Sequence, residues 1–195
     1  MRIRKSFIVA ITVASITSIA GAHTTVYQAV MNGPNESPAN ASPGTGAATV
    51  TLDLDLITMR VQANFTGLIG TTTQAHIHGL TPTPLTGTAS VLSVTPSFTG
   101  FPLGVTSGTY DHTYDMTLAS SYNAPFVTNN GGTVSGALNA LTLGLNTGRT
   151  YFNLHSSAFL GGEIRGFLVA VPEPATIATL VGGATLISRR VRRRS

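Results

Sequence analysis

The clearest structural signal in the chain lies in residues 50–65, where apolar and polar side chains alternate in two successive runs. The first run reads Val50-Thr51-Leu52-Asp53-Leu54-Asp55-Leu56, and the second reads Met59-Arg60-Val61-Gln62-Ala63-Asn64-Phe65. Alternation with a period of two is typical of β-strands that bury one face. Because only Ile57 and Thr58 separate the runs, they predict an antiparallel hairpin.

Similar patterns recur along the rest of the chain. They predict further strands at residues 25–31, 72–78, 89–94, 106–118, 150–155 and 163–169. Apolar residues at helical spacing over 137–145 follow two candidate capping residues, Thr133 and Ser135, and predict one short helix. We therefore expect an all-β domain: a single antiparallel β-sandwich of about eight strands, immunoglobulin-like or superoxide-dismutase-like, with a short helix before the last two strands.

Composition and charge exclude several classes of protein. The chain has 195 residues and no cysteine, which allows one domain with an ordinary core and excludes a disulfide scaffold. The net charge is +4, but the basic residues gather at the two ends. Residues 23–170 hold three arginines against six acidic groups, a net charge of −3, so the core lacks the basic surface that nucleic-acid binding needs.

The N-terminal segment has the pattern of a secretory leader. Arg2, Arg4 and Lys5 precede an apolar run over residues 7–20, which is too short for the ~20 residues of a membrane span. Small residues at 20–22 fit cleavage by signal peptidase after Ala22. We expect residues 1–22 to be a signal peptide.

The C-terminal segment combines three parts. Val-Pro-Glu-Pro-Ala at 171–175, with Pro172, Glu173 and Pro174 at its centre, is followed by an apolar stretch over 176–187. A basic cluster comes last, formed by Arg189, Arg190, Arg192, Arg193 and Arg194. A basic end after an apolar segment favours a cytoplasmic C-terminus and an exported domain. The arrangement resembles the bacterial PEP-CTERM sorting signal, which implies transient membrane association and removal of the tail of 171–195 by an exosortase.

Histidines supply the sharpest candidate site. His76 and His78 are two residues apart on an expected strand, so both imidazoles project from one face. His155 lies on another expected strand, where alternation separates it from the apolar face. Three imidazoles on one surface are the ligands of a copper or zinc site.

A further motif, Gly161-Gly162-Glu163-Ile164-Arg165-Gly166, places Glu163 and Arg165 on one face of a strand as an internal ion pair or polar cluster. Three other motifs precede it, namely Asn32-Gly33-Pro34-Asn35-Glu36-Ser37-Pro38, Ala75-His76-Ile77-His78-Gly79 and Tyr151-Phe152-Asn153-Leu154-His155. Together the four motifs, in this order, resemble the chordin (CHRD) domain over residues 23–170. The resemblance implies an extracellular all-β domain and brings no established enzymatic activity.

Two interpretations of the histidines stay open. They form either a buried polar cluster that fixes strand register or a metal site. A His-x-His strand is similar to part of the copper site of copper/zinc superoxide dismutase, with Asp111 and His112 as conceivable further ligands, which is an analogy at the level of the fold. Cleavage after Ala22 would also give His23 a free amine that can chelate copper beside its imidazole.

No complete catalytic set is present: there is no cysteine nucleophile, no Gly-x-Ser-x-Gly elbow and no nominated carboxylate pair. The sequence therefore predicts an exported, non-catalytic module at the cell envelope or in the extracellular matrix, with a structural, adhesive or matrix-interaction role. Its expected partners are signal peptidase, exosortase and an extracellular polysaccharide or other matrix component. The alternative is a metal-binding or redox domain, superoxide-dismutase-like, that uses the His-x-His site.

Overall fold

A computed structural model describes residues 23–172, so the expected leader and all of the expected sorting signal beyond Pro172 lie outside the described residues. The elements follow one another as β1 (Thr24–Asn32), η1 (Gly33–Asn35), β2 (Thr45–Asp53), β3 (Thr58–Thr66), β4 (Thr72–Gly79), β5 (Gly108–Asp115), η2 (Ala119–Ser121), α1 (Ala124–Asn129), α2 (Val134–Asn146), β6 (Thr150–Ser156), β7 (Ile164–Phe167) and β8 (Val169–Ala170). None of the described helices is long and apolar enough to cross a membrane.

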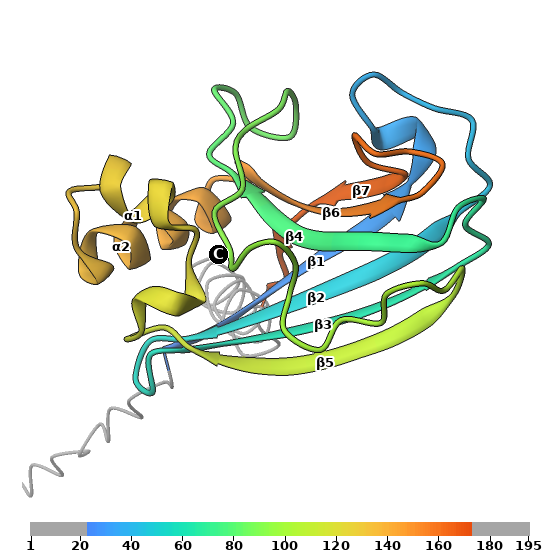
Figure 1. The fold of residues 1–195 in the computed structure, drawn as a ribbon. Helices are drawn as coiled ribbons and strands as arrows, with labels where there is room; N and C mark the ends of the chain where they lie inside the picture. The colour runs from blue at the N-terminus through green and yellow to red at the C-terminus, as the bar shows by residue number, and fades with distance from the viewer. Residues whose placement is uncertain (1–22, 173–195) are drawn as a thin grey trace, which may run out of the picture.

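The strands form one antiparallel sheet in the order β4-β6-β7-β1-β2-β3-β5, with β8 also paired to β1. The sheet curls so that β4, β6 and β7 arch over the half made by β1, β2, β3 and β5 (Figure 1). The expected all-β class is confirmed. The sandwich-like shape comes from a single sheet that curls on itself and encloses the core.

The hairpin expected at residues 50–65 is β2 and β3, which pair antiparallel with Val50 opposite Val61 and Leu52 opposite Met59. These four side chains are almost fully buried, whereas Arg60 between them is exposed. Burial of alternate residues explains the register, because a slip by one residue would turn the apolar set to solvent. The chain therefore pairs as its alternation predicts.

An irregular segment, residues 95–107, fills the open side between β4 and β5. Its backbone bonds to β4 where Phe98 N–H donates to Ala75 O at 3.0 Å and Thr72 N–H donates to Val105 O at 2.8 Å. Phe98 packs between Phe152 of β6 and Tyr110 of β5, with ring centroids 5.6 and 5.8 Å away. These contacts join the two ends of the curled sheet across the core.

The expected short helix is α2, and Thr133 caps it by accepting the Gly136 N–H at 3.1 Å. The structure adds a second helix, α1, which the sequence did not predict; Pro125 stands in its first turn, where a missing N–H does no harm. The prediction of a strand at residues 89–94 is wrong. That segment forms isolated bridges only, at Val91 and Ser93, since Ser93 bonds to the Ile77 N–H through its side chain rather than extending a ladder.

Candidate metal centre

The three candidate ligands come from two neighbouring strands. His76 and His78 lie on β4 and His155 on β6, and the register places His76 opposite Asn153 and His78 opposite Tyr151. Ile77, between the two β4 histidines, points into the core. The imidazoles therefore stand on the other face of the sheet, where loops rather than the core cover them.

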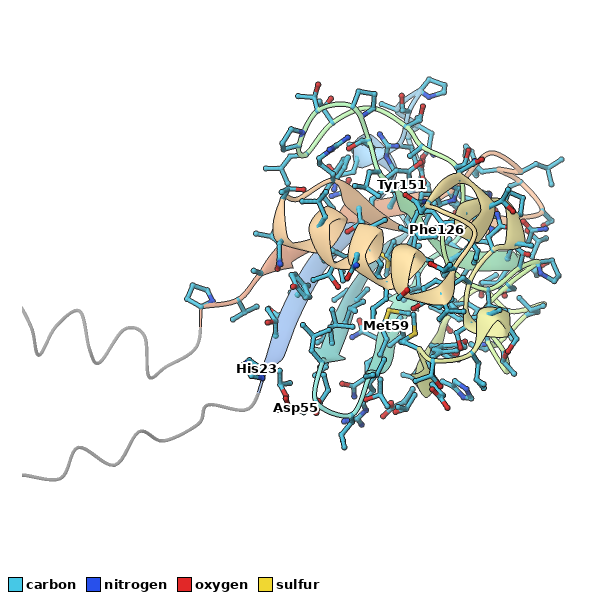
Figure 2. The ribbon with its side chains drawn as sticks, turned by 90° about the vertical axis from the view of Figure 1, so that its left-hand side faces the viewer. His23, Asp55, Met59, Phe126 and Tyr151 are labelled. Atoms are coloured by element: carbon cyan, nitrogen blue, oxygen red, sulfur yellow. The ribbon has the colours of Figure 1, made fainter. Side chains whose placement is uncertain are left out.

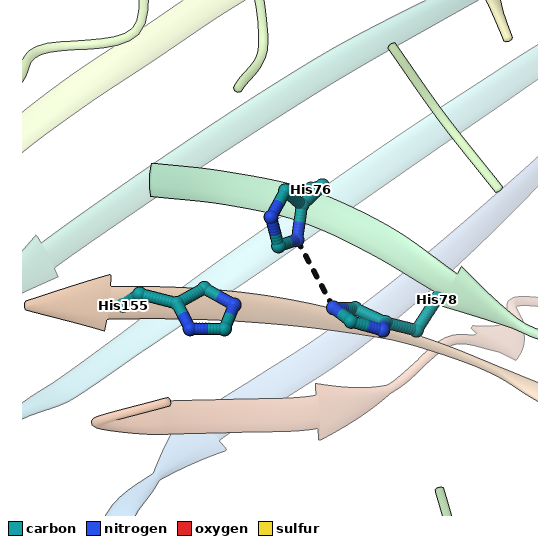
Figure 3. Close-up of side chains that lie close together, drawn as sticks. All are labelled: His76, His78 and His155. Carbon is teal, nitrogen blue, oxygen red and sulfur yellow. Dashed lines mark hydrogen bonds between the residues drawn. The ribbon is translucent and has the colours of Figure 1, made fainter. Parts of the chain in front are cut away.

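The structure brings these three histidines together. One ring nitrogen from each histidine lies within 4.8 Å of the corresponding nitrogens of the other two. His78 Nε2 lies 3.0 Å from His76 Nδ1 (Figure 3). The ring of His155 lies across from both, with centroids 4.7 Å from His76 and 6.1 Å from His78. A tetrahedral ion with bonds of about 2.0–2.1 Å would hold its ligand nitrogens about 3.4 Å apart, so small side-chain adjustments suffice.

Backbone carbonyls fix the protonation of two rings. A carbonyl oxygen only accepts hydrogen bonds, so His78 Nδ1 must donate to Ala89 O at 2.8 Å. For the same reason His155 Nδ1 donates to Leu160 O at 2.9 Å. In each neutral ring the proton is then on Nδ1, which leaves a lone pair on Nε2, the atom that faces the cluster. Metal-bound histidines commonly carry such an outer hydrogen bond.

Gln74 provides the corresponding partner for the third ring. Its Oε1 lies 3.4 Å from His76 Nε2. When Nε2 carries the proton and points it toward Gln74, His76 Nδ1 presents a lone pair to the lone pair of His78 Nε2. A cation between the two nitrogens removes the repulsion between these lone pairs. Without a metal, the repulsion is removed when the His76 proton lies on Nδ1 instead and is donated to His78 Nε2. Both states use neutral rings.

Burial keeps the cluster uncharged. Loss of solvation, helped by the neighbouring imidazoles, lowers the pKa of His76 to about 3. Burial also lowers the pKa of His78 to about 4, against the raising effect of its bond to Ala89, and it lowers the pKa of His155. Neutral imidazole is the form that binds metal, so no proton has to leave at neutral pH.

Two buried acceptors of this face have no hydrogen-bond partner within residues 23–172. They are His155 Nε2 and Asn153 Oδ1, two residues apart on the same side of β6. An unpaired buried polar atom destabilises the folded state by about 1–3 kcal/mol. A bound cation would accept the lone pair of His155 and remove that penalty, which a purely structural polar cluster leaves in place.

Glu163 and Arg165 do not pair with each other. Glu163 Oε1 accepts the Ser42 hydroxyl and the Ile69 N–H, both at 2.6 Å. Arg165 Nε instead lies 3.8 Å from Glu36 Oε2. Of the two alternatives, an internal ion pair or a polar cluster, the direct ion pair does not form, because the two residues meet different loops. Both side chains are fully or almost fully buried in polar surroundings.

The remaining candidate ligands lie elsewhere. Asp111 and His112 are on β5, at the opposite end of the sheet order from β4, and Asp111 pairs with Arg60. His23 is exposed, and its backbone N–H and Nδ1 both contact the Asp55 carboxylate, at 3.1 and 2.9 Å. Figure 2 shows this pair near the start of β1, far from Tyr151. The structure does not bring these groups to the cluster.

Three residues of the site were not singled out from the sequence. Tyr151 stacks on His78, Asn153 stands opposite His76, and Glu36 reaches Arg165. Each belongs to one of the motifs quoted above, and the alternation of β6 puts Tyr151, Asn153 and His155 on one face. That pattern could have identified Tyr151 and Asn153, but no local pattern connects Glu36 to a strand 129 residues later.

Comparison with known proteins gives one match. The sequence matches the family model of the CHRD domain over residues 27–168, a range that includes the three clustered histidines, Glu36 and Arg165. Neither the curated proteins nor the solved structures yield a match.

Proposed function

The chain belongs to the CHRD domain family, and on this premise we propose that it is an exported, non-catalytic β module that holds a copper or zinc ion between His76, His78 and His155. The observation that carries the proposal is the arrangement of outer hydrogen bonds. Ala89 and Leu160 fix the free lone pairs of two rings toward a common point, and Gln74 provides a partner for the third.

The ligand set favours copper or zinc over other ions. Imidazole nitrogen suits both metals, whereas calcium and magnesium take oxygen ligands. Three histidines with a fourth position filled by solvent or another group resemble known three-histidine zinc sites in their donor set. The neutral state of the rings at pH 7 supports binding without proton release.

Burial supports a holding role over catalysis. His76 and His155 are 3% and 8% exposed, and the loops that carry Ala89 and Leu160 lie over them. A site covered in this way protects an ion and ties two loops to the sheet. Redox chemistry of the superoxide-dismutase type remains the alternative for a copper-loaded site, because the same three ligands would serve it.

Export and sorting rest on the terminal sequence signals. The leader pattern of 1–22 and the three-part tail of 171–195 support delivery to the cell envelope or extracellular matrix, with signal peptidase and exosortase as processing partners. A structural, adhesive or matrix-binding role would follow from that location. Membership of the CHRD domain family is compatible with an extracellular, non-catalytic module.

Metal analysis of the purified full-length chain tests the proposal. The chain has five histidines, so two complementary variants divide them: one replaces His76, His78 and His155 by Asn, and the other replaces His23 and His112. After dialysis against trace copper and zinc, we expect about one ion per chain in the native protein and the second variant, and none in the first. Equal metal in both variants, or none in the native protein, would refute the proposal. A single His155→Asn variant covers the case in which the triple variant fails to fold.

A further inference from the structure

Two of the sequence motifs that the metal site leaves unexplained meet on the surface. The Asn32–Pro38 segment, which contains η1, packs beside Arg165 and Phe167 of β7. Between them and the loop at residues 85–87 lies a depression of about 450 Å³. This volume is within the range of small-ligand sites.

Within residues 23–172, Arg165 is the one cationic residue that lines the depression. It is only 5% exposed, which is unusual for arginine unless it is paired. Its Nε–H donates to the Asn35 carbonyl and its Nη1 donates to Gly87 O at 3.1 Å. A guanidinium carries five N–H donors, so these two bonds leave three for other acceptors. The backbone carbonyls of Asn35 and Gly87 thus hold the guanidinium in place and leave some of its N–H donors available for a ligand.

The guanidinium of Arg165 faces the rings of Tyr151 and Phe167, whose centroids lie 4.8 and 5.8 Å from its central carbon, but among the described residues it has no carboxylate within hydrogen-bond distance. Among the described residues the carboxylate nearest to it is that of Glu36, whose Oε2 lies 3.8 Å from Nε, beyond normal hydrogen-bond distance. Burial raises the pKa of Glu36 to about 7, although the charge of Arg165 acts to lower it. Glu36 therefore carries a full negative charge only part of the time near neutral pH, and the depression is left with an excess of positive charge.

The walls combine this charge with apolar surface. Val30, which is 72% exposed, and Leu85, which is 56% exposed, line the depression together with Phe167. A guanidinium fork matches a carboxylate in two parallel hydrogen bonds. Apolar and aromatic walls fit the hydrocarbon face of a ring that carries such a group.

We propose that this depression binds a carboxylate-bearing saccharide, with Arg165 as the anchor for the carboxylate and Phe167, Val30 and Leu85 as the wall for the sugar ring. The acidic polysaccharide of an extracellular matrix presents this chemistry in repeated units. The inference goes beyond the metal proposal and does not depend on it, because Arg165 is not among the proposed metal ligands. It rests on the proposed matrix role of the protein and names the surface that would bind the matrix.

The test is a titration of the purified full-length chain with a galacturonic acid trimer, followed by calorimetry and by the amide resonance of Gly87. Neutral galactose trimer and sodium acetate are titrated in parallel. One exposed substitution changes the charge of the site: Val30→Glu adds a carboxylate to a residue that lines it. Leu56→Glu is the matched control, because Leu56 is also 72% exposed and lies on the turn between β2 and β3.

We expect the acidic trimer to bind, to bind at least about fivefold more weakly in Val30→Glu, and to bind unchanged in Leu56→Glu. Arg165→Lys should weaken it about tenfold by removing the fork. Binding of acetate as tight as that of the trimer would overturn the proposal, because the apolar wall would then contribute nothing to the affinity. No binding of either acid, equal binding of the neutral trimer, or a Val30→Glu variant that binds like the native chain would overturn the proposal. Metal content is measured in the same samples, so failure here is distinguishable from failure of the metal site.

Discussion

Tyr151 stacks on His78, with ring centroids 4.9 Å apart and ring planes 6° from parallel. The guanidinium carbon of Arg165 lies 4.8 Å from the centroid of the same tyrosine ring. One side chain therefore contacts both the proposed metal centre and the proposed saccharide site. The loop over residues 85–89 also serves both, since Gly87 accepts from Arg165 and Ala89 accepts from His78.

Metal binding should stabilise the fold. An ion that binds only the folded chain adds about 2.7 kcal/mol to the free energy of unfolding when it is present at 100 times its dissociation constant. We expect this gain in urea unfolding of the native chain with zinc, relative to the same chain in chelator. The variant His155→Asn should lose the gain, and His112→Asn should keep it. A gain of equal size in His155→Asn would contradict the assigned ligands.

The metal-free fold should lose stability in acid. Burial lowers the pKa of His76 to about 3 and of His78 to about 4. In the unfolded chain both histidines have a pKa of 6.5, so they take up protons at pH values at which the folded chain keeps them neutral. Stability is therefore present above pH 6.5 and falls as the pH drops toward 4. Between pH 7 and 5 the loss is about 2 kcal/mol for each ring that stays neutral. Urea unfolding in chelator at the two pH values measures it, and a His78→Gln variant should lose about 2 kcal/mol less than the native chain.

Glu36 should act in the opposite direction. Burial raises its pKa from 4.5 to about 7, so the folded state binds a proton that the unfolded state has released, and this contribution to stability is lost as the pH rises from 4.5 to 7. Acidification from pH 7 to 5 restores about 2 kcal/mol. In Glu36→Gln that compensation is absent, so its loss of stability over the same interval should be about 2 kcal/mol larger than in the native chain. Identical pH profiles would show that Glu36 titrates normally.

Two adjacent glycines provide a matched test of the packing around the site. A Cβ added at Gly162 would lie 2.7 Å from both Glu36 Oε1 and Asn153 Oδ1, and its φ of +129° is unfavourable for any L side chain. A Cβ at Gly161 would meet no atom within 4 Å. We expect Gly162→Ala to lower the free energy of unfolding by at least about 2 kcal/mol, and Gly161→Ala to change it by less than about 0.5 kcal/mol. Similar values for the two variants would mean that Glu36 and Asn153 do not pack against Gly162 as described.

Much of the fold could be predicted from local pattern. Alternation over residues 50–65 identified β2 and β3 because one face of each is buried, and helical spacing identified α2 with its Thr133 cap. The prediction of a strand at residues 89–94 was wrong because the apolar residues of this segment pack onto β4 without forming a regular ladder of backbone hydrogen bonds. Phe98 bridges the two ends of the curled sheet through its contacts with β5 and β6, and such distant packing leaves no periodic signal in the sequence.

The site was predictable where strand geometry alone places residues. His76 and His78 share a face by their spacing, and His155 joins them because β4 and β6 happen to be neighbours in the sheet. Glu163 and Arg165 do not form a direct ion pair, because each side chain bonds to a loop: Glu163 to Ser42, and Arg165 to the carbonyls of Asn35 and Gly87. Contacts between loops far apart in the sequence are set by tertiary packing, which alternation does not encode.

X-ray absorption at the zinc edge of the zinc-loaded full-length chain tests the central claim most directly, because it counts the ligands of the ion itself. The account predicts three imidazole nitrogens at about 2.0–2.1 Å, with the multiple-scattering pattern of histidine rings. One fewer imidazole should be found in the His155→Asn variant, and three in the His23→Asn, His112→Asn variant. A shell of oxygens with fewer than two imidazoles in the native chain would contradict the account.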